Sequence, residues 1–261
     1  MTGPSTPDSP VWTRNPPSRR PALTREAIVA AAIEIGDTEG LAAISIRRIA
    51  AHLGARAMSL YTHIDRKEDL LDLMADEVIS EILVADAELP ADWREAITRI
   101  TRLERQVLLR HPWLTEMIGF QRFSPGPNRL HHLEQCLKAL DGLGLDGPSA
   151  IRVVGAVTHY MLGCVIREAS DADLHRDRCG GHDEKLPYLL ALTEGPEFPR
   201  LGPLLRAGSF VKPSPEQRFE QGLEWLLDGI EASVGKPGGL GGPAHRGRTT
   251  LDSSQTGTGD S

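Results

Sequence analysis

Residues 45–67 concentrate side chains that can bind nucleic acid. Guanidinium, ammonium, hydroxyl and imidazole groups donate hydrogen bonds to phosphate oxygens, and some of them also read base edges in the major groove. Solvated helix faces more often carry Glu and Lys pairs, so this mixture favours DNA as the partner. The candidate DNA-binding residues are Ser45, Arg47, Arg48, Arg56, Met58, Ser59, Tyr61, Thr62, His63 and Lys67.

Two short helices joined by a turn are predicted to position these residues. Ser45 can cap the first helix, and Gly54 permits the positive φ of a tight turn. A second helix is expected from about Arg56 to His63, with Leu60 facing inward. The inner face of the first helix consists of Ile46, Ile49, Ala50 and Leu53. The pattern predicts a helix-turn-helix. The alternative, an ordinary corner between two helices of a bundle, explains the apolar residues but not the exposed polar ones.

Helical periodicity continues along the rest of the chain, and no alternating pattern typical of β-strands appears. Thr24 is the expected N-cap of a helix that ends between Gly36 and Gly40. Capping boxes are expected at 65–68, 92–95 and 214–217. Further helices are predicted over about 65–89, 92–110, 128–140, 148–169 and 215–234, with short broken pieces over 170–213. We therefore predict an all-α fold.

The composition is that of a globular protein with two tails. The chain has 261 residues, of which 40% are hydrophobic and 25% are charged, which is ordinary for a folded domain. Residues 1–22 hold six of the 19 prolines, and residues 235–261 are rich in Gly, Ser and Thr, so we expect a disordered arm and a disordered tail. The arginines between Arg14 and Arg20 could follow a minor groove or phosphates, or carry incidental charge.

Charge is divided unevenly along the chain. Residues 1–67 contain nine Lys and Arg against six Asp and Glu, a balance of +3. Because the whole chain carries −7, the remainder must carry −10. A basic N-terminal part on an acidic body indicates two separate tasks, with nucleic acid as the partner of the first.

No membrane or secretion signal is apparent. The most apolar stretch, 150–166, is about one residue short of a membrane span and is interrupted by Arg152, Thr158 and His159. Prolines occupy the first 17 residues where a signal peptide needs an apolar run. The three cysteines are an odd number without a CxxC pair, which favours a reducing compartment. We expect a cytoplasmic protein with no membrane partner.

One motif resembles a known family of regulators. Leu60–His63 (Leu-Tyr-Thr-His) followed by Lys67–Leu71 (Lys-Glu-Asp-Leu-Leu) is similar to the signature of TetR-family transcriptional regulators, whose DNA-binding unit matches Leu23–Leu83. The resemblance implies that Tyr61 and Lys67 contact phosphates and that Arg47 reaches a base or a phosphate. It places Met58, Ser59 and His63 toward the major groove.

The resemblance continues into the tetracycline-repressor branch of the family. Leu133–Gln135 and Gly155–Val165 lie in matching places. The implied architecture is an N-terminal three-helix helix-turn-helix domain over 23–84, with the start of the linking helix, and a helical ligand-binding and dimerisation domain over 85–234.

The resemblance also implies a function and an assembly. Helices 148–169 and 215–234 would form the interface of a homodimer. The dimer would be a repressor released from a palindromic double-stranded DNA operator by a small molecule. The alternative is a regulator without such an effector, controlled by a partner protein or by oxidation of Cys136 or Cys179. The chain contains no GxSxG, P-loop, HExxH or GxGxxG motif, so we predict no enzyme.

The expected effector differs from that of the tetracycline repressors. Residues 113–118 contain no histidine to hold the magnesium ion that joins drug to protein in that branch, and Cys136 stands where the branch has a polar amide. We therefore expect an apolar or aromatic effector. The candidate effector-pocket residues are Ile100, Glu104, Trp113, Met117, Ile118, Leu133, Cys136, Val154 and Thr158.

No metal or other cofactor is predicted. His131 and His132 are expected to form a solvated pair on a helix face. His175, Cys179 and His182 have residue types and spacing that could bind zinc, but they lie in a Gly-rich segment without a second cluster. We expect no metal there.

Overall fold

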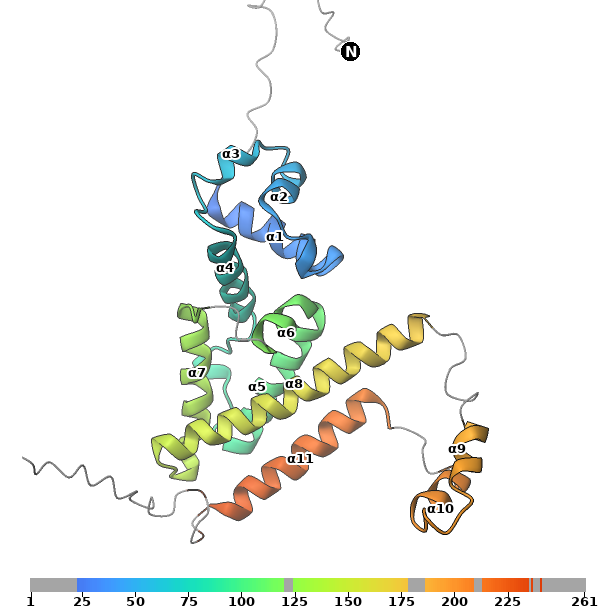
Figure 1. The fold of residues 1–261 in the computed structure, drawn as a ribbon. Helices are drawn as coiled ribbons and strands as arrows, with labels where there is room; N and C mark the ends of the chain where they lie inside the picture. The colour runs from blue at the N-terminus through green and yellow to red at the C-terminus, as the bar shows by residue number, and fades with distance from the viewer. Residues whose placement is uncertain are drawn as a thin grey trace, which may run out of the picture. The chain divides into compact units, whose positions relative to one another are not determined.

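The computed structural model describes residues 23–119, 124–177, 186–208 and 213–234, together with Lys236 and Leu240. The all-α prediction is confirmed: within these residues there is no β-strand, only an isolated bridge between Val234 and Leu240. The α-helices are α1 (Arg25–Glu39), α2 (Ile46–His52), α3 (Ala57–Leu60), α4 (Lys67–Ser80), α5 (Trp93–Arg110), α6 (Pro112–Gly119), α7 (Pro127–Ala139), α8 (Gly147–Asp177), α9 (Leu186–Leu192), α10 (Leu201–Arg206) and α11 (Pro215–Ser233) (Figure 1). Three 3₁₀ turns are η2 (Leu41–Ala43), η3 (Asp86–Glu88) and η4 (Asp141–Leu143).

The chain divides into two compact units. The first comprises Met1–Leu83 and Gln106–His132, and the second comprises Val84–Arg105 and Leu133–Ser261. Helices α5 and α7 therefore contribute to both units. The predicted arm, and the predicted tail apart from Lys236 and Leu240, lie outside the described residues.

The first unit is organised around α1. This helix packs against α2, α4 and α6 because its apolar residues recur at helical spacing and form one buried face. The buried side chains of α1 include Ile28, Val29, Ala32 and Ile35, and those of α4 include Leu70, Met74, Val78 and Ile79.

Side-chain caps set the starts of α1 and α2 in the first unit, whereas α3 and α4 begin without one. The Thr24 hydroxyl accepts a hydrogen bond from the Ala27 N–H (3.1 Å), as predicted. The predicted capping box at 65–68 is wrong, because α4 begins one residue later with Arg66 as its N-cap and without a side-chain cap. The Arg66 guanidinium instead bonds to Asp69 within the first turn (2.6 Å).

Helix α4 is shorter than the apolar pattern predicts. It ends at Ser80 rather than near Leu89, since the N–H groups of Glu81 and Ile82 bond to carbonyls three residues back and tighten the last turn. Ile82 is still buried, which explains why the spacing of apolar residues suggested a longer helix.

The second unit is built on the antiparallel pair α8 and α11 (Figure 1). Side chains from both helices form its core: Val153, Val157, Met161 and Val165 from α8, and Phe219, Leu223, Leu227 and Ile230 from α11. The Tyr160 hydroxyl donates to the Phe219 carbonyl (2.7 Å), and a Cβ on Gly222 would lie 2.3 Å from that hydroxyl oxygen. Gly222 therefore allows the two helices to approach closely.

The start of α11 confirms a sequence prediction. The Ser214 hydroxyl accepts from the Gln217 N–H (3.1 Å), and the Gln217 amide oxygen accepts from the Ser214 N–H (3.0 Å). Pro215 occupies the first turn, where it costs no hydrogen bond. This reciprocal arrangement is the predicted capping box.

Helix α8 extends beyond its predicted end to Asp177, and much of its apolar surface is exposed. Its segment Gly147–Ser170 is long and apolar enough to cross a membrane by length and composition, a test that core helices of soluble proteins also pass. Ile151 and Ile166 of α8 are about half exposed, and Trp225 of α11 is 68% exposed. This pair of helices thus leaves large apolar side chains uncovered.

The histidine pair of α7 is only partly as predicted. His131 is exposed, but His132 is buried, so the prediction of a solvated pair is wrong for His132. His132 shares a face with Cys136 and Ala139, which are also buried. The side chains of His175, Cys179 and His182 lie outside the described residues.

Candidate nucleic-acid interface

The helix-turn-helix is formed by α2, a tight turn and α3. The Ser45 hydroxyl accepts from the Arg48 N–H (3.2 Å) and starts α2. Gly54 has φ of 61°, a conformation that other residues rarely adopt, and the Ala55 N–H then bonds to the Ala50 carbonyl (2.8 Å). Leu60 is fully buried. This side chain fixes α3 against the rest of the unit.

Helix α3 is a single turn, shorter than predicted. It ends at Leu60, and residues 61–63 continue as a hydrogen-bonded turn in which the His63 N–H bonds to the Leu60 carbonyl (2.9 Å). The Thr62 hydroxyl donates to the Ser59 carbonyl (2.7 Å) and closes this turn. The predicted contact residues after Leu60 are therefore presented by a turn rather than by a helix.

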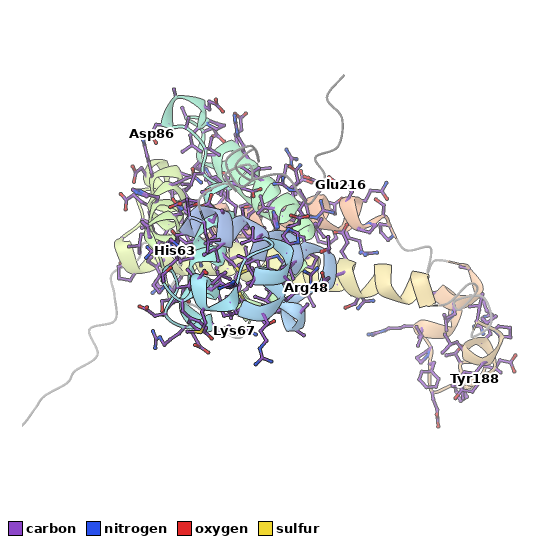
Figure 2. The ribbon with its side chains drawn as sticks, turned by 90° about the horizontal axis from the view of Figure 1, so that it is seen from above. Arg48, His63, Lys67, Asp86, Tyr188 and Glu216 are labelled. Atoms are coloured by element: carbon purple, nitrogen blue, oxygen red, sulfur yellow. The ribbon has the colours of Figure 1, made fainter. Side chains whose placement is uncertain are left out.

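Most predicted DNA-binding side chains face solvent. Arg48 and His63 are half-buried, and the other eight are exposed. Met58 is 75% exposed and Tyr61 is 47% exposed, although both are large and mainly apolar. Figure 2 labels Arg48 of α2, His63 in the turn after α3 and Lys67 at the start of α4. An apolar surface of this kind, surrounded by basic and hydroxyl groups, suits the edges and methyl groups of bases.

The basic side chains fall into two groups. The Arg48 guanidinium pairs with the carboxylate of Glu39, which it contacts through Nε (3.1 Å) and a terminal nitrogen, and this hydrogen bond lowers the pKa of Glu39. Among the described residues, Arg47, Arg56 and Lys67 form no salt bridge. Lys67 is also the first residue of α4, where backbone N–H groups without helical partners favour an anion. These three cations are the best candidates for phosphate contacts.

Comparison with known proteins identifies the family. Residues 86–234 match the family model described as the tetracyclin repressor-like C-terminal domain. The chain belongs to the TetR family. It is a DNA-binding transcriptional regulator, and the helix-turn-helix described above is the family's DNA-binding element.

Relatives cover nearly the whole of this TetR-family chain. An HTH-type transcriptional regulator of Saccharopolyspora erythraea is 32% identical over 229 residues, which cover 86% of this chain and 92% of that protein. The HTH-type transcriptional repressor DrrR1 of Streptomyces coeruleorubidus is 32% identical over 240 residues, with 87% and 85% covered. The crystal structure of the TetR-family protein ActR of Streptomyces coelicolor in complex with actinorhodin has a TM-score of 0.68 at 30% identity, covering 82% of this chain and 98% of ActR.

The candidate effector-pocket residues of this TetR-family regulator are distributed over both units. Trp113, Met117 and Ile118 lie on α6 in the first unit, and the other six lie in the second. Ile100, Glu104, Trp113, Met117 and Cys136 are buried, and Ile118, Leu133, Val154 and Thr158 are half-buried. The indole N–H of Trp113 donates to Asp37 (2.7 Å), a contact that the sequence did not predict.

Clefts lie within each unit of the part of the chain that the structure describes. A cleft of about 600 Å³ between α5 and α11 is lined by none of the candidate effector-pocket residues, and its arginines Arg94 and Arg102 are paired with acids of α11. A cleft of about 310 Å³ in the first unit includes Lys67, Glu116 and Met117. Met117 is thus the candidate pocket residue that borders a cleft close to the DNA-binding element.

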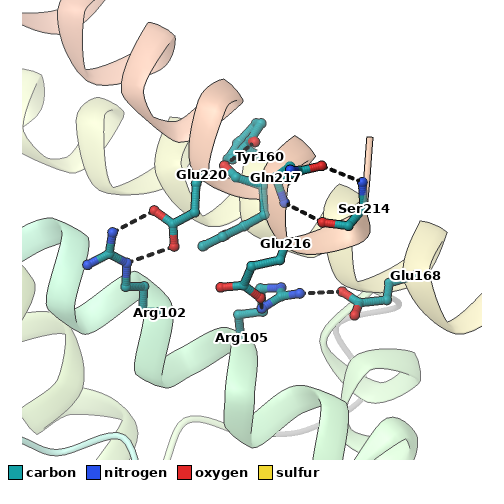
Figure 3. A network of polar contacts seen from close by, with 9 residues as sticks. Arg102, Arg105, Tyr160, Glu168, Ser214, Glu216, Gln217 and Glu220 are labelled. Atoms are coloured by element: carbon teal, nitrogen blue, oxygen red, sulfur yellow. Dashed lines mark hydrogen bonds and ion pairs between the residues drawn. The ribbon is translucent and has the colours of Figure 1, made fainter. Parts of the chain in front are cut away.

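A buried arginine connects three helices of the second unit (Figure 3). The side chain of Arg105 is 8% exposed, and its terminal nitrogens bond to Glu168 of α8 (2.8 Å) and Glu216 of α11 (2.9 Å). Its guanidinium also lies 4.9 Å from the centre of the Phe219 ring. Because the charge is both paired and placed over an aromatic face, it can be accommodated away from water. The sequence gave no indication of this network.

Proposed function

We propose that the protein is a homodimeric repressor that binds a palindromic operator through α2 and α3 and is released by a small apolar or aromatic molecule. It acts in the cytoplasm and carries out no catalysis. The observation that carries this proposal is the exposed face of the helix-turn-helix. Met58 and Tyr61 are exposed there, and Arg47, Arg56 and Lys67 are exposed and form no salt bridge with any residue that the structure describes. The DNA-binding domain spans 23–84 in this proposal, and the ligand-binding and dimerisation domain spans 85–234.

The exposed apolar surface of α8 and α11 supports the homodimer. Ile151, Ile166 and Trp225 are large apolar side chains that this chain leaves exposed, and exposed apolar surface is typical of interaction sites where it gathers into a patch. A second copy supplies the same apolar surface by symmetry. Two DNA-binding elements on one dimer then reach successive major grooves about 34–36 Å apart.

The effector class follows from the residues on α6 and their surroundings. Residues 113–118 offer Trp113, Leu114, Met117 and Ile118 and no histidine, so the chemistry favours an apolar ring system over a magnesium chelate. The structure of the relative ActR with actinorhodin supports a small-molecule effector for this chain as well. An effector releases DNA only if it binds the conformation with low operator affinity more tightly than the other.

Burial of Cys136 favours an effector over oxidation at this residue. Cys136 is 6% exposed, and oxidation of a cysteine needs access to its sulfur. Cys179, the other cysteine of that alternative, lies outside the described residues. Control by a partner protein has no comparable observation in its favour.

The test is selection of genomic DNA fragments by the purified full-length protein, followed by sequencing of what is retained. Wild-type protein should enrich a palindromic site. A variant with Arg47→Gln and Lys67→Gln should lose the enrichment, whereas Lys138→Gln, which removes an exposed charge in the second unit, should keep it. A folded dimeric wild-type protein that enriches no site would contradict the proposal.

The enriched fragment then serves to find the effector. A library of aromatic and apolar compounds is screened for a rise in the unfolding temperature, and each hit is tested for release of the fragment. A compound that stabilises the protein and lowers operator affinity supports the proposal. Stabilising compounds that all leave operator affinity unchanged would contradict release by an effector.

A further inference from the structure

Helix α6 carries a buried hydroxyl group without a hydrogen-bond partner. Thr115 is 8% exposed, and its Oγ1 atom forms no hydrogen bond within the part of the chain that the structure describes. Buried polar groups of folded proteins are paired in the great majority of cases, because an unpaired group loses its bonds to water and gains none. The hydroxyl of Thr115 therefore destabilises the chain in this state.

A buried threonine of α5 shows how such a hydroxyl is ordinarily paired. Thr101 is 2% exposed, and its hydroxyl donates to the Ile97 carbonyl four residues back (2.7 Å). A helix permits this bond because the carbonyl of the preceding turn lies within reach of the side chain. The Thr115 hydroxyl does not use the corresponding carbonyl, that of His111. It is therefore free to bond a group from outside the helix.

Thr115 lies away from the side of α6 that packs on α1. Successive helical residues are turned by about 100°, so Thr115 stands about 200° round from Trp113. Trp113 lies against α1, where a Cβ on Gly36 would be 2.9 Å from its ring, and Met117 borders the cleft of about 310 Å³. Ile118, three residues after Thr115, shares its side of the helix. Thr115 is thus beside a candidate effector-pocket residue.

Packing alone does not require a hydroxyl at this position. The other fully buried side chains of α6 are large and apolar: Trp113, Leu114 and Met117. Valine has the shape of threonine and would avoid the unpaired group. Small-molecule pockets are lined mainly by apolar side chains, with a few polar groups that orient the ligand and give specificity. Thr115 supplies one such group on a helix that otherwise offers apolar surface.

We propose that the Thr115 hydroxyl forms a hydrogen bond with the effector, which is an aromatic ring system carrying a carbonyl or hydroxyl oxygen. This inference rests on the proposed function and adds Thr115 to its pocket. A hydroxyl both donates and accepts, so it pairs with either kind of oxygen. A ring without such an oxygen leaves Thr115 unpaired, and it binds more weakly for that reason.

The experiment uses naphthalene, naphthol and tetralone as probes that differ in their oxygen group. The unfolding temperature of the full-length protein is measured over a series of concentrations of each probe, which yields its Kd. Wild-type protein should bind naphthol or tetralone at least about tenfold more tightly than naphthalene, the effect of pairing one buried polar group. Thr115→Val should bind all three probes with the affinity that the wild type has for naphthalene.

The stability of the ligand-free protein distinguishes a ligand-binding role from a structural one. Thr115→Val removes a hydroxyl without a partner, so it should keep or raise the unfolding temperature. Thr101→Val is the matched control, because it removes a hydroxyl that is bonded within α5. It should lower the unfolding temperature and retain the preference of the wild type for an oxygen-bearing probe.

Three results would overturn the inference. The first is a wild-type protein without a preference for an oxygen-bearing probe, including the case in which no probe binds. The second is a Thr115→Val variant that retains the preference. The third is a loss of stability in Thr115→Val as large as in Thr101→Val, which would mean that the hydroxyl is paired inside the folded protein.

Failure of the proposed function would be observed separately. None of these measurements uses DNA, so they report on the ligand site alone. A protein that shows the expected probe preference but enriches no genomic fragment would contradict the proposed function and not the contact of Thr115. A protein that releases its fragment with an effector to which Thr115→Val binds equally well would contradict the contact and not the proposed function.

Discussion

The carboxylate of Asp76 on α4 occupies the space that a side chain on Gly126 would need. A Cβ at Gly126 would lie 2.4 Å from Cγ of Asp76. The same carboxylate accepts hydrogen bonds from the N–H groups of Asn128 (3.3 Å) and Arg129 (3.1 Å) in the first turn of α7. One helix thus supplies the N-terminal cap of another, and both segments belong to the first unit.

Substitution of Gly126 by alanine should destabilise the protein. The added methyl group must displace Asp76 and break the cap of α7, at an expected cost of about 1–3 kcal/mol in the free energy of unfolding. Urea denaturation measures this cost. Gly142→Ala is the control, because a Cβ there meets nothing within 4 Å. Equal stability of the two variants would mean that Asp76 does not hold α7.

Removal of the Arg105 guanidinium should cost more than removal of its neighbour. Arg105→Met leaves the half-buried Glu168 without its partner and takes away the cation over Phe219, so we expect a loss of about 2 kcal/mol. Arg102 pairs with Glu220 but is 53% exposed, and Arg102→Met should cost less than about 1 kcal/mol. Chemical denaturation of both variants provides the comparison. If Arg102→Met costs more stability than Arg105→Met, solvent exposure does not determine which of the two ion pairs contributes more to the free energy of unfolding.

Glu39 should contribute stability only while it is ionised. The hydrogen bond from Arg48 lowers its pKa below the ordinary value of 4.5. Since the folded-state pKa is the lower one, the contribution is fully present above the ordinary value and is lost as the pH falls through the folded-state pKa. The unfolding temperature of Glu39→Gln should therefore be lower than that of the wild type near neutral pH, and the two should converge in acid. A constant difference at all pH values would contradict this account.

The two kinds of DNA contact should differ in their response to salt. If Lys67 of each protomer neutralises one phosphate, Lys67→Gln removes two contacts from the dimer and should reduce the slope of log K against log salt by about 1.8, or about 0.9 per contact. Met58→Ala removes no charge, so it should weaken binding to the enriched fragment without changing the slope. Anisotropy titrations over a series of salt concentrations give both values. If Lys67→Gln leaves the slope unchanged, Lys67 does not contact a phosphate.

The dimer should depend on Trp225. Trp225→Arg places a charge on the exposed apolar surface of α11, and we expect the dimer dissociation constant to rise by about tenfold or more. Sedimentation velocity measures the change. Leu130→Arg is the control, since Leu130 is comparably exposed, at 59%, but lies on α7. Dissociation by Leu130→Arg and not by Trp225→Arg would place the interface elsewhere.

Features that depend on neighbouring residues were predictable from the sequence. The caps at Thr24, Ser45 and Ser214 and the turn at Gly54 each involve groups within a few positions of one another, so residue type and spacing suffice to predict them. The error at Asp65 is also local. Because α4 begins one residue later than predicted, Arg66 and not Asp65 occupies the N-cap position. The burial of His132 could have been predicted from its helical spacing with Cys136 and Ala139.

Contacts between distant segments could not be predicted in this way. Asp37 is 74 residues from His111 and 76 from Trp113 along the chain, and no local pattern indicates which donors a carboxylate will meet. Trp113 was predicted as a pocket residue from its apolar character. Its indole N–H donates a hydrogen bond to Asp37, and the apolar pattern does not predict this contact. The candidate site residues on α2 and α3 were accessible to sequence reasoning because they occupy one continuous segment.

In the single turn of α3, the residue needed for stability differs from the residues that can be substituted. Of its four residues, only Leu60 is buried, and Met58 and Ser59 contribute no side chain to the core. Substitutions at these two positions alter the surface that we propose faces DNA, at little cost in stability. Duplicated copies of such a gene can therefore diverge toward new operators by a few mutations, while the remainder of the fold stays under unchanged selection.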